Sequence, residues 1–217
     1  LDAIDGDMLH GWWFDPRTGK ADSFGELKSE GVKRITPPAD GEHFVCDVDL
    51  FDAEKDRFPY EDEWFDTVLC CELVEHLPGD PMHMMSEVNR ILKRGGHFVL
   101  TTPNICSFRA IAAILQGYHP GFFPAYIRPA ENAEETEARH AREYAPREIA
   151  QLFNDAGFDL SLLETGEFRD EIHPEYGWVR HLLATCGLST ELRGDGIYAV
   201  GVKTGPVRER FPAWLYS

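Results

Sequence analysis

The sequence predicts an α/β protein with a doubly wound, mostly parallel sheet that has helices on both faces. Phe65–Cys71 is a near-continuous apolar run, as expected for a central parallel strand that is covered on both faces. Residues 81–92 carry apolar side chains at helical spacing, and Gly95-Gly96 ends that helix and starts a second strand over residues 97–102. Because ligands of such sheets bind at the carboxyl ends of the strands, we expect a small-molecule site directly after Phe65–Cys71.

The N-terminal part of the chain contains two further expected strands. Residues 8–14 (MLHGWWF) are apolar and aromatic and are followed by the turn signal Asp15-Pro16, which favours a strand that ends there. Residues 17–41 are rich in glycine, proline and charge, and we expect a loop with at most one short helix. The next strand is expected over residues 43–48.

The C-terminal half continues the alternation of helices and strands. Pro146 suits the first turn of a helix and Gly157 its end. Residues 117–143 are expected to form an inserted lid or loop, whose aromatic part, residues 118–126 (YHPGFFPAY), would cover a substrate. The final residues, RERFPAWLYS, are expected to form an ordered tail packed on the domain. In chain order, helices are expected over residues 105–116, 146–157 and 176–186, and strands over 158–164 and 197–203.

Length and composition favour a single, reduced, cytoplasmic domain. The 217 residues suffice for one domain with a sizeable core, no apolar run is long enough to span a membrane, and no signal sequence opens the chain. The formal net charge of -17 argues against nucleic acid or an anionic membrane as a partner, although it is compatible with a cationic ligand. The five cysteines show no spacing typical of a metal knuckle, which fits a reduced compartment.

Glu72, Glu75 and His76 form an ExxEH motif immediately after the strand Phe65–Cys71. We expect a helix to begin there, and positions three or four apart on a helical turn share a face, so the three side chains can converge. Two carboxylates and an imidazole suit Mg²⁺, Mn²⁺, iron or zinc, whereas a neutral histidine without a metal can accept a proton. The motif is therefore compatible either with a metal site or with a general base.

The motifs DRFPYEDEWFDTVLCCELVEHL and EVNRILKRGGHFVLTTPN resemble those of class I S-adenosylmethionine-dependent methyltransferases. The resemblance is to the small-molecule branch related to ubiquinone and sugar methyltransferases (types 11 and 12), and it covers roughly residues 44–202. It implies a Rossmann-like, seven-stranded sheet whose last strand is antiparallel, which residues 197–203 would form. It also implies that residues 8–14 are the second strand, with residues 1–7 as the tail of the preceding helix.

One departure from the family concerns its glycine-rich loop, which follows the first strand and approaches the cofactor. This loop is not found in the sequence. Either the first strand and its loop lie upstream, or the protein lacks them, in which case cofactor binding is in doubt. We prefer the first alternative, because a parallel sheet without its central strand would expose apolar strand edges.

The resemblance implies S-adenosylmethionine as the cofactor and suggests which residues contact it. Asp15 would accept hydrogen bonds from the ribose hydroxyls, although an aspartate before proline is equally typical of a turn. Asp52, with the backbone amide of Ala53, would meet the adenine, and Asp47 and Asp49 are competitors for that role. The residues that would line the central portion of the cofactor are Cys71, Glu72 and Leu73.

The resemblance also bears on the metal and on the base. Certain methyltransferases use ExxEH to hold a divalent ion that binds vicinal hydroxyls of the substrate, and RNA 2′-hydroxyl methyltransferases of that type add a histidine from a later loop. His140 lies at a comparable place, so the candidate metal ligands are Glu72, Glu75, His76 and His140. Many relatives carry the motif without a metal, so a divalent metal is the less expected alternative. His76 and His140 are then the candidates for removing a proton from an oxygen nucleophile, and either one could instead be a structural hydrogen bonder.

Taken together, these features predict a methyltransferase that acts on a hydroxyl of a small-molecule substrate, without nucleic acid or membrane as partner. The alternative is a non-catalytic domain of the same fold that binds a ligand without turnover. A nicotinamide dehydrogenase is disfavoured, because it too requires a glycine fingerprint. An RNA 2′-hydroxyl methyltransferase is opposed by the acidic charge.

Overall fold

The computed structural model describes residues 8–15, 20–28, 33–35, 46–49, 51–122, 140–167 and 174–217. By its internal contacts the chain divides into two compact units, Leu1–Asp52 and Ala53–Ser217, and each is described by itself. The prediction of one methyltransferase domain over residues 1–217 stays a prediction.

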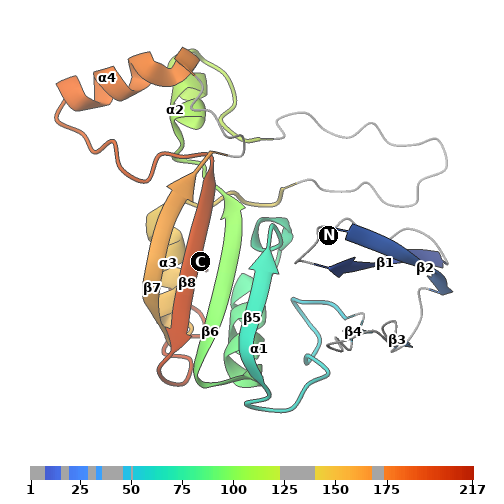
Figure 1. Cartoon of the computed structure of the whole chain (residues 1–217). Helices are drawn as coiled ribbons and strands as arrows, with labels where there is room; N and C mark the ends of the chain where they lie inside the picture. The colour runs from blue at the N-terminus through green and yellow to red at the C-terminus, as the bar shows by residue number, and fades with distance from the viewer. Residues whose placement is uncertain are drawn as a thin grey trace. The chain divides into compact units, whose positions relative to one another are not determined.

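Two strand pairs form the described part of the first unit (Figure 1). β1 (Met8–Asp15) pairs antiparallel with β2 (Lys20–Lys28), and a bulge lies between Gly11 and Trp12. β3 (Lys33–Ile35) pairs antiparallel with β4 (Cys46–Val48).

This unit corrects two expectations. The strand at residues 8–14 is present, but it pairs with β2 in a two-stranded antiparallel sheet and is not the second strand of a parallel sheet. Residues 17–41, expected as a loop, contain β2 and β3. The physical reason is local: only four residues, 16–19, separate β1 from β2, and a connection that short favours a hairpin. Because β2 contains several charged residues, its sequence lacks the apolar periodicity by which a strand is predicted.

A four-stranded sheet in the order β5-β6-β8-β7 forms the centre of the second unit (Figure 1). β5 and β6 are parallel, and β8 runs antiparallel to both β6 and β7, so three strands share one direction. The sequence predicted that the strands at residues 65–71 and 97–102 are parallel and that the last strand is antiparallel. Both predictions are confirmed. The strand bounds are β5 Phe65–Cys71, β6 Leu92–Pro103, β7 Phe158–Gly166 and β8 Gly196–Lys203.

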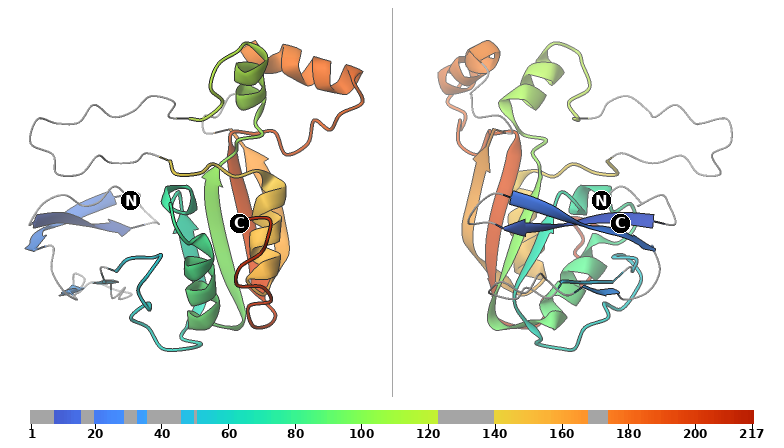
Figure 2. Two further views of the ribbon diagram at one scale, coloured as in Figure 1. Left: turned by 180° about the vertical axis from the view of Figure 1, so that it is seen from behind. Right: turned by 45° about the vertical axis from the view of Figure 1, so that its right-hand side comes forward.

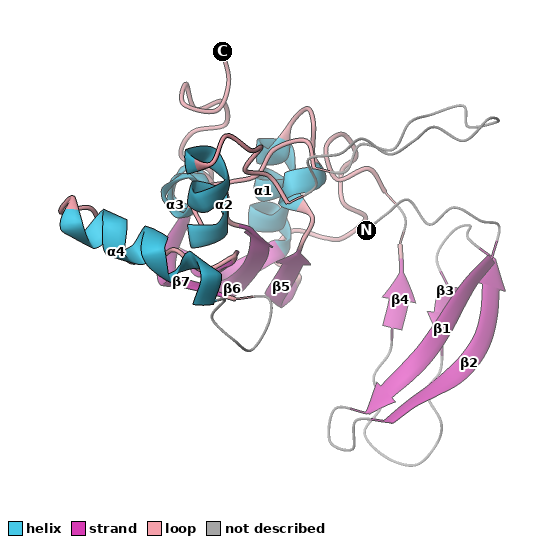
Figure 3. Cartoon of the chain, turned by 90° about the horizontal axis from the view of Figure 1, so that it is seen from above, coloured by secondary structure: helices cyan, strands magenta, loops and turns pink. Residues whose placement is uncertain are grey.

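α1 (Pro81–Ile91) and α3 (Pro146–Asp155) pack on one face of this sheet (Figures 2 and 3). The helix-covered face contains a buried aromatic group in which the Phe98 and Phe153 rings are 5.2 Å apart and Phe98 and Phe158 are 5.5 Å apart. Side chains alternate between the two faces of a strand, and the opposite face includes exposed apolar residues: Leu69, Leu162 and Tyr198. In the described part of the second unit, the sheet therefore has one well-packed face.

α2 (Phe108–Leu115) and α4 (Gly177–Thr185) pack on each other beyond the carboxyl ends of β5 and β6 (Figure 1). Their contact is a small apolar cluster of Phe108, Ala112, Val179 and Leu183. Both helices were predicted, with ends that differ by a few residues. Within the described ranges, no helix is both long enough and apolar enough to cross a membrane.

The C-terminal tail packs on the second unit, as predicted. Arg210 donates to both carboxylate oxygens of Asp80, at 2.9 and 2.6 Å, and the Tyr216 hydroxyl donates to Asp80 Oδ1 at 2.5 Å. Trp214 Nε1 donates to Asp155 Oδ2 at 2.8 Å. Because Asp80 caps the start of α1 and Asp155 ends α3, the tail connects two helices.

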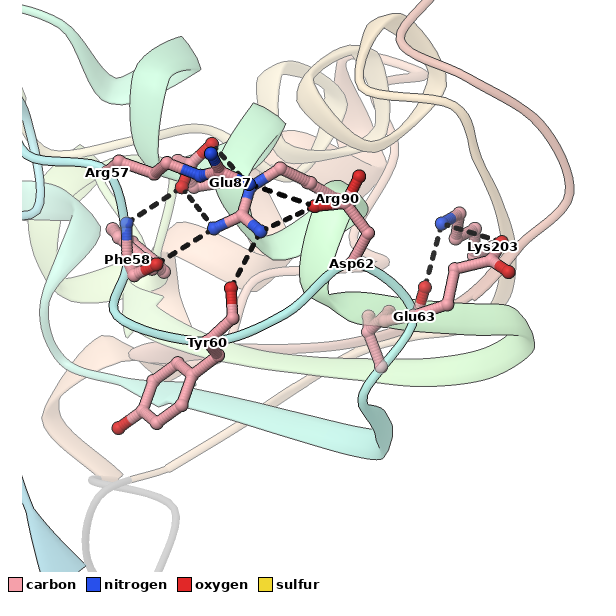
Figure 4. A network of polar contacts seen from close by, with 9 residues as sticks. Arg57, Phe58, Tyr60, Asp62, Glu63, Glu87, Arg90 and Lys203 are labelled. Atoms are coloured by element: carbon pink, nitrogen blue, oxygen red, sulfur yellow. Dashed lines mark hydrogen bonds and ion pairs between the residues drawn. The ribbon is translucent and has the colours of Figure 1, made fainter.

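The last turn of α1 holds the loop that precedes β5, through the guanidinium of Arg90 (Figure 4). Arg90 donates to both oxygens of Glu87, at 2.9 and 2.7 Å, and to the backbone carbonyls of Phe58 and Tyr60, at 2.9 and 2.8 Å. Glu87 in turn accepts from the Phe58 backbone amide at 2.8 Å. This network fixes the loop at the amino end of β5, opposite to the end where the ExxEH motif lies.

Candidate functional site

The chain turns sharply at Glu72, directly after β5. Glu72 has a φ of 51°, in the left-handed region that side chains other than glycine rarely adopt. Its backbone amide donates to the Thr101 carbonyl at 3.0 Å, and its Oε1 accepts from Thr101 Oγ1 at 2.8 Å. A conformation of this kind costs on the order of 1 kcal/mol and is concentrated at functional sites. The two contacts to Thr101, at the end of β6, hold the turn.

The helix expected immediately after Phe65–Cys71 is a single 3-10 turn, η1 (Val74–His76), and α1 begins only at Pro81. Pro78 and Gly79 separate the two, because proline cannot continue a helix and glycine favours a turn. The expected helix at the motif is therefore only one 3-10 turn, whereas the helix predicted over residues 81–92 is confirmed as α1. η1 places Glu75 and His76, but not Glu72, on one helical turn.

Glu75 is fully buried beside the end of β6. Its Oε2 accepts from Thr102 Oγ1 at 2.8 Å, and its Oε1 lies 3.9 Å from His76 Nε2 with no hydrogen-bond partner among the described residues. Burial raises the pKa of Glu75, because it disfavours the charged carboxylate, and the hydrogen bond from Thr102 acts in the opposite direction. The site thus contains a buried carboxyl group with one oxygen that is not satisfied.

His140 reaches the same place from a distant part of the sequence. The backbone amides of Ala141 and Arg142 donate to the Glu75 carbonyl at 2.8 and 3.1 Å, which fixes this segment against η1. The His140 and His76 rings meet edge to face, with centroids 4.9 Å apart. Glu75, His76 and His140 each offer a ligand atom, and these atoms lie within 4.8 Å of one another.

Three of the four metal candidates are therefore brought together, and Glu72 lies outside the group. A carboxylate and two imidazoles are a donor set that divalent transition metals accept, and the unsatisfied Glu75 oxygen fits such a role. The same arrangement fits proton transfer, because a histidine that is shielded from water lies next to a second histidine and a carboxyl group. The geometry alone is compatible with both chemistries.

The predicted cofactor residues fall in both units. Asp15 is the last residue of β1, and Asp52 lies in the loop after β4, both in the first unit. Cys71 is exposed at the end of β5, and Glu72 and Leu73 are half-buried beside it in the second unit, to which Ala53 also belongs. Roles for Asp15, Asp52 and Ala53 in cofactor binding stay predictions.

The predicted lid over residues 117–143 lies partly outside the described residues, which omit 123–139. Of the aromatic segment 118–126, residues 118–122 are described, and Tyr118 is exposed. Phe122 contacts the site: its backbone amide donates to Glu143 Oε1 at 2.7 Å, and the Arg109 guanidinium stacks 3.8 Å over its ring. The substrate-covering role of the segment stays a prediction.

Three residues that support the site were not predicted. Thr101 and Thr102 hold Glu72 and Glu75, and Glu143 accepts a hydrogen bond from His140. The adjacent threonines at the end of a predicted strand were a usable signal, because successive residues of a strand point to opposite faces and can support two different side chains. The role of Glu143 depends on its contact with Phe122 and on its burial, which no local pattern reveals.

The described residues of the second unit line two cavities near the ends of the strands. One, of about 650 Å³, is lined by residues 57–62 at the amino end of β5. The other, of about 530 Å³, lies beyond the carboxyl end of β6, with Cys106, Arg147 and Arg193 among its lining residues. The second is on the edge of the sheet where ligands of parallel strands bind, and the first is not.

The sequence matches the family model of the methyltransferase domain over residues 8–163. Among curated proteins, none matches the sequence.

Several solved structures with a similar chain trace are described as methyltransferases. A SAM-dependent methyltransferase from Thermotoga maritima is 22% identical, with a TM-score of 0.42, and the match covers 70% of this chain and 60% of that one. A SAM-dependent methyltransferase from Methanosarcina mazei is 17% identical, with a TM-score of 0.44 and coverage of 70% and 65%. A structure of the Trm112 methyltransferase activator of Haloferax volcanii with a methyltransferase gives 17% identity, a TM-score of 0.42 and coverage of 71% and 60%. The present chain thus spans 60–65% of the length of these three.

Proposed function

The chain belongs to the class I S-adenosylmethionine-dependent methyltransferases, and on this premise we propose that it methylates a hydroxyl oxygen of a small-molecule acceptor. The observation that carries the proposal is the group of Glu75, His76 and His140, which lies at the carboxyl end of β5, where ligands of parallel sheets bind. The charge of -17 disfavours a nucleic-acid acceptor, so we assign a small molecule as the partner.

The turn after β5 is the proposed surface for the cofactor. Cys71 is exposed, Glu72 and Leu73 are half-buried, and the backbone turns at Glu72, whose φ is positive. When bound, S-adenosylmethionine supplies a methyl group activated by a positively charged sulfur. The carboxylate of Glu72, retained by Thr101, would accept hydrogen bonds from the cofactor. For Asp15, Asp52 and Ala53, contact with the cofactor is proposed on the resemblance alone.

His76 and His140 are the proposed proton acceptors. Methyl transfer is an in-line displacement, so positioning and exclusion of water provide most of the rate, but a hydroxyl nucleophile must also lose its proton. His140 is the more enclosed of the two, with a side-chain exposure of 9% against 29% for His76. A neutral imidazole in this position takes the proton of the acceptor hydroxyl as the oxygen attacks.

A divalent metal on Glu75, His76 and His140 is the alternative use of the same atoms. A metal ion would take up the nitrogen lone pairs that proton transfer requires, so the two mechanisms exclude each other. We place the base first and expect methyl transfer to continue in EDTA. Loss of turnover in EDTA, restored by Mg²⁺, Mn²⁺ or Zn²⁺, would instead assign the three residues to a metal.

The first test is calorimetric titration of the chain with S-adenosylhomocysteine, with and without EDTA. We expect a Kd in the micromolar range in both conditions. No detectable binding in either condition would remove the enzymatic function and leave the non-catalytic binding domain as the better description.

The second test measures transfer of a radiolabelled methyl group from S-adenosylmethionine to a panel of monosaccharides and phenols. His140→Ala and His76→Ala are expected to lower kcat by about 10²–10⁴-fold for the histidine that acts as the base, with the Kd for S-adenosylhomocysteine changed less than about twofold. His97→Ala is the control, because His97 is exposed on β6. Full activity in both the His76 and the His140 variants would contradict the proposal.

A further inference from the structure

Glu143 has an unusual environment for a glutamate. Its side chain is only 6% exposed, and its Oε1 accepts from His140 Nδ1 at 3.0 Å and from the Phe122 backbone amide at 2.7 Å. Its Oε2 is buried and has no hydrogen-bond partner within the described ranges.

These contacts determine which nitrogen of His140 carries the proton. An ionised carboxylate can only accept hydrogen bonds, so His140 Nδ1 must donate to Glu143. In the neutral ring, the lone pair is then on Nε2. A base that accepts a proton at Nε2 requires this tautomer, and the other tautomer would present a proton instead of a lone pair.

A purely structural role explains Glu143 poorly. A buried carboxylate oxygen without a partner destabilises the folded state by about 1–3 kcal/mol or more, so the residue is unfavourable for folding alone. Glu148, five positions later, shows what a stabilising glutamate looks like in the same segment. Its Oε1 accepts from Arg142 at 2.6 Å and its Oε2 from the Ala145 backbone amide at 2.8 Å, at the start of α3.

The position of the His140 ring is fixed by other contacts. The following backbone amides, of Ala141 and Arg142, bind the Glu75 carbonyl, and the His76 ring packs against it edge to face. Glu143 is therefore not needed to bring His140 to the site. Glu143 instead determines how the His140 ring is rotated and which of its nitrogens carries the proton.

We propose that Glu143 is a positioning residue that holds His140 with the proton on Nδ1 and so leaves the Nε2 lone pair for the acceptor hydroxyl. This inference rests on the proposed function of His140 as the base. It adds a residue to the site that acts on the substrate only through His140.

The decisive measurement is the nitrogen NMR spectrum of the protein labelled with ¹⁵N-histidine, at a pH of about 8, where an ordinary histidine is neutral. The His140 signals are assigned from the His140→Asn spectrum. We expect a protonated Nδ1 and an unprotonated Nε2 in the wild-type protein. In Glu143→Leu no oxygen remains to accept from Nδ1, and we expect the Nδ1 proton signal of His140 to be weakened or lost.

Glu148→Gln is the matched control. Glutamine can still cap the start of α3, so the fold is retained and the tautomer of His140 should not change. A wild-type spectrum with the proton on Nε2, or an unchanged His140 tautomer in Glu143→Leu, would overturn the inference. This measurement needs neither cofactor nor acceptor, so it decides the inference even if methyl transfer is never detected.

The kinetic test uses the acceptor of the panel that gives the highest rate. Glu143→Leu should lower kcat at least about tenfold, with KM and the Kd for S-adenosylhomocysteine within about twofold of wild type, and Glu148→Gln should leave kcat unchanged. A tautomer that changes in Glu143→Leu without any loss of kcat would overturn the catalytic part of the inference, and with it the assignment of His140 as the base.

Discussion

Glu72 and Glu75 follow the same strand, but their surroundings differ. Glu72 is half-buried and accepts from Thr101, whereas Glu75 is fully buried and accepts from Thr102. Water can replace a lost partner at Glu72 but not at Glu75. The hydrogen bond from Thr102 to Glu75 should therefore contribute more to the free energy of unfolding than the hydrogen bond from Thr101 to Glu72.

Thr102→Val is expected to lower the free energy of unfolding by about 1–3 kcal/mol, because it leaves both oxygens of the buried Glu75 carboxyl without a partner. Valine has nearly the shape of threonine, so the change removes little besides the hydroxyl. Urea denaturation followed by circular dichroism measures it. Thr101→Val is the matched control and should have a smaller effect, and an equal loss in the two variants would contradict the difference in burial.

Sequence analysis found part of the residue-scale site. The spacing of ExxEH predicted that Glu72, Glu75 and His76 converge, but the metal-type group contains only Glu75 and His76 of the motif, because the 3-10 turn begins after Glu72. His140 came only from a resemblance, and Glu143 was not found. Both depend on the path of the chain between β6 and α3, which is set by tertiary contacts such as those to the Glu75 carbonyl.

At the scale of elements, α3 and α4 end in the same way but in different surroundings. Each is followed by a glycine with positive φ, 87° at Gly157 and 69° at Gly187. A Cβ at Gly157 would lie 2.4 Å from the Pro206 carbonyl oxygen, whereas a Cβ at Gly187 would meet no described atom within 4 Å. An alanine at Gly187 therefore tests only the cost of the backbone conformation, whereas an alanine at Gly157 tests that cost together with a steric clash.

Gly187→Ala should destabilise the fold by about 1 kcal/mol, the energetic cost of placing an alanine in the left-handed region. Gly157→Ala should add a steric contribution and reach about 2–4 kcal/mol, because the nearest atom is backbone and cannot rotate away. Thermal unfolding of the two variants compares them directly. Similar melting temperatures for both would mean that residues 205–206 shift easily.

The elements found from the sequence are those whose pattern is set locally. The bounds of Phe65–Cys71 were predicted to the residue from its apolar run, but the expectation of a central strand covered on both faces is wrong for the described sheet, where this strand lies at the edge and only Cys70 is buried. The start of α3 at Pro146 followed from the geometry of proline. The β1–β2 hairpin was missed because its second strand, KADSFGELK, has no continuous apolar side, and strand pairing there does not depend on such a pattern.

At the scale of the whole second unit, the tail joins the two helices that cover the sheet. Burial raises the pKa of Asp80, but the hydrogen bonds from Arg210 and Tyr216 outweigh it and hold the pKa below its usual value. Burial and the hydrogen bond to Asp80 raise the pKa of Tyr216 to about 12. The charged form of Asp80 is therefore the one that the fold favours.

Asp80→Asn is expected to lower the free energy of unfolding at pH 7 by about 1–3 kcal/mol. Asparagine caps a helix as well as aspartate does, so the variant removes the negative charge of residue 80 and keeps its helix cap. Because the pKa of Asp80 is lowered in the folded state, its contribution is complete above the unfolded value of about 4 and is lost as the pH falls through the lower, folded value. The difference between the two proteins in urea denaturation should thus shrink as the pH falls below about 4.

Asp159→Asn serves as the control, since Asp159 pairs with Arg208 on the surface and should contribute less. If the difference in the free energy of unfolding between wild type and Asp80→Asn stays constant down to pH 2, the charge of Asp80 is not what stabilises the fold.

The position of β8 has a consequence for the order in which the protein folds. β8 lies between β6 and β7 and pairs with both, yet it is the last of the three to be synthesised. Until residues 196–203 enter the sheet, β6 and β7 each present an open edge, and such edges invite pairing between chains. Joining strands that are far apart in the sequence is also slow, because a long loop must close first. The step that completes this sheet is therefore the one at which refolding molecules are most exposed to aggregation, and dilution should raise the refolding yield more than added time.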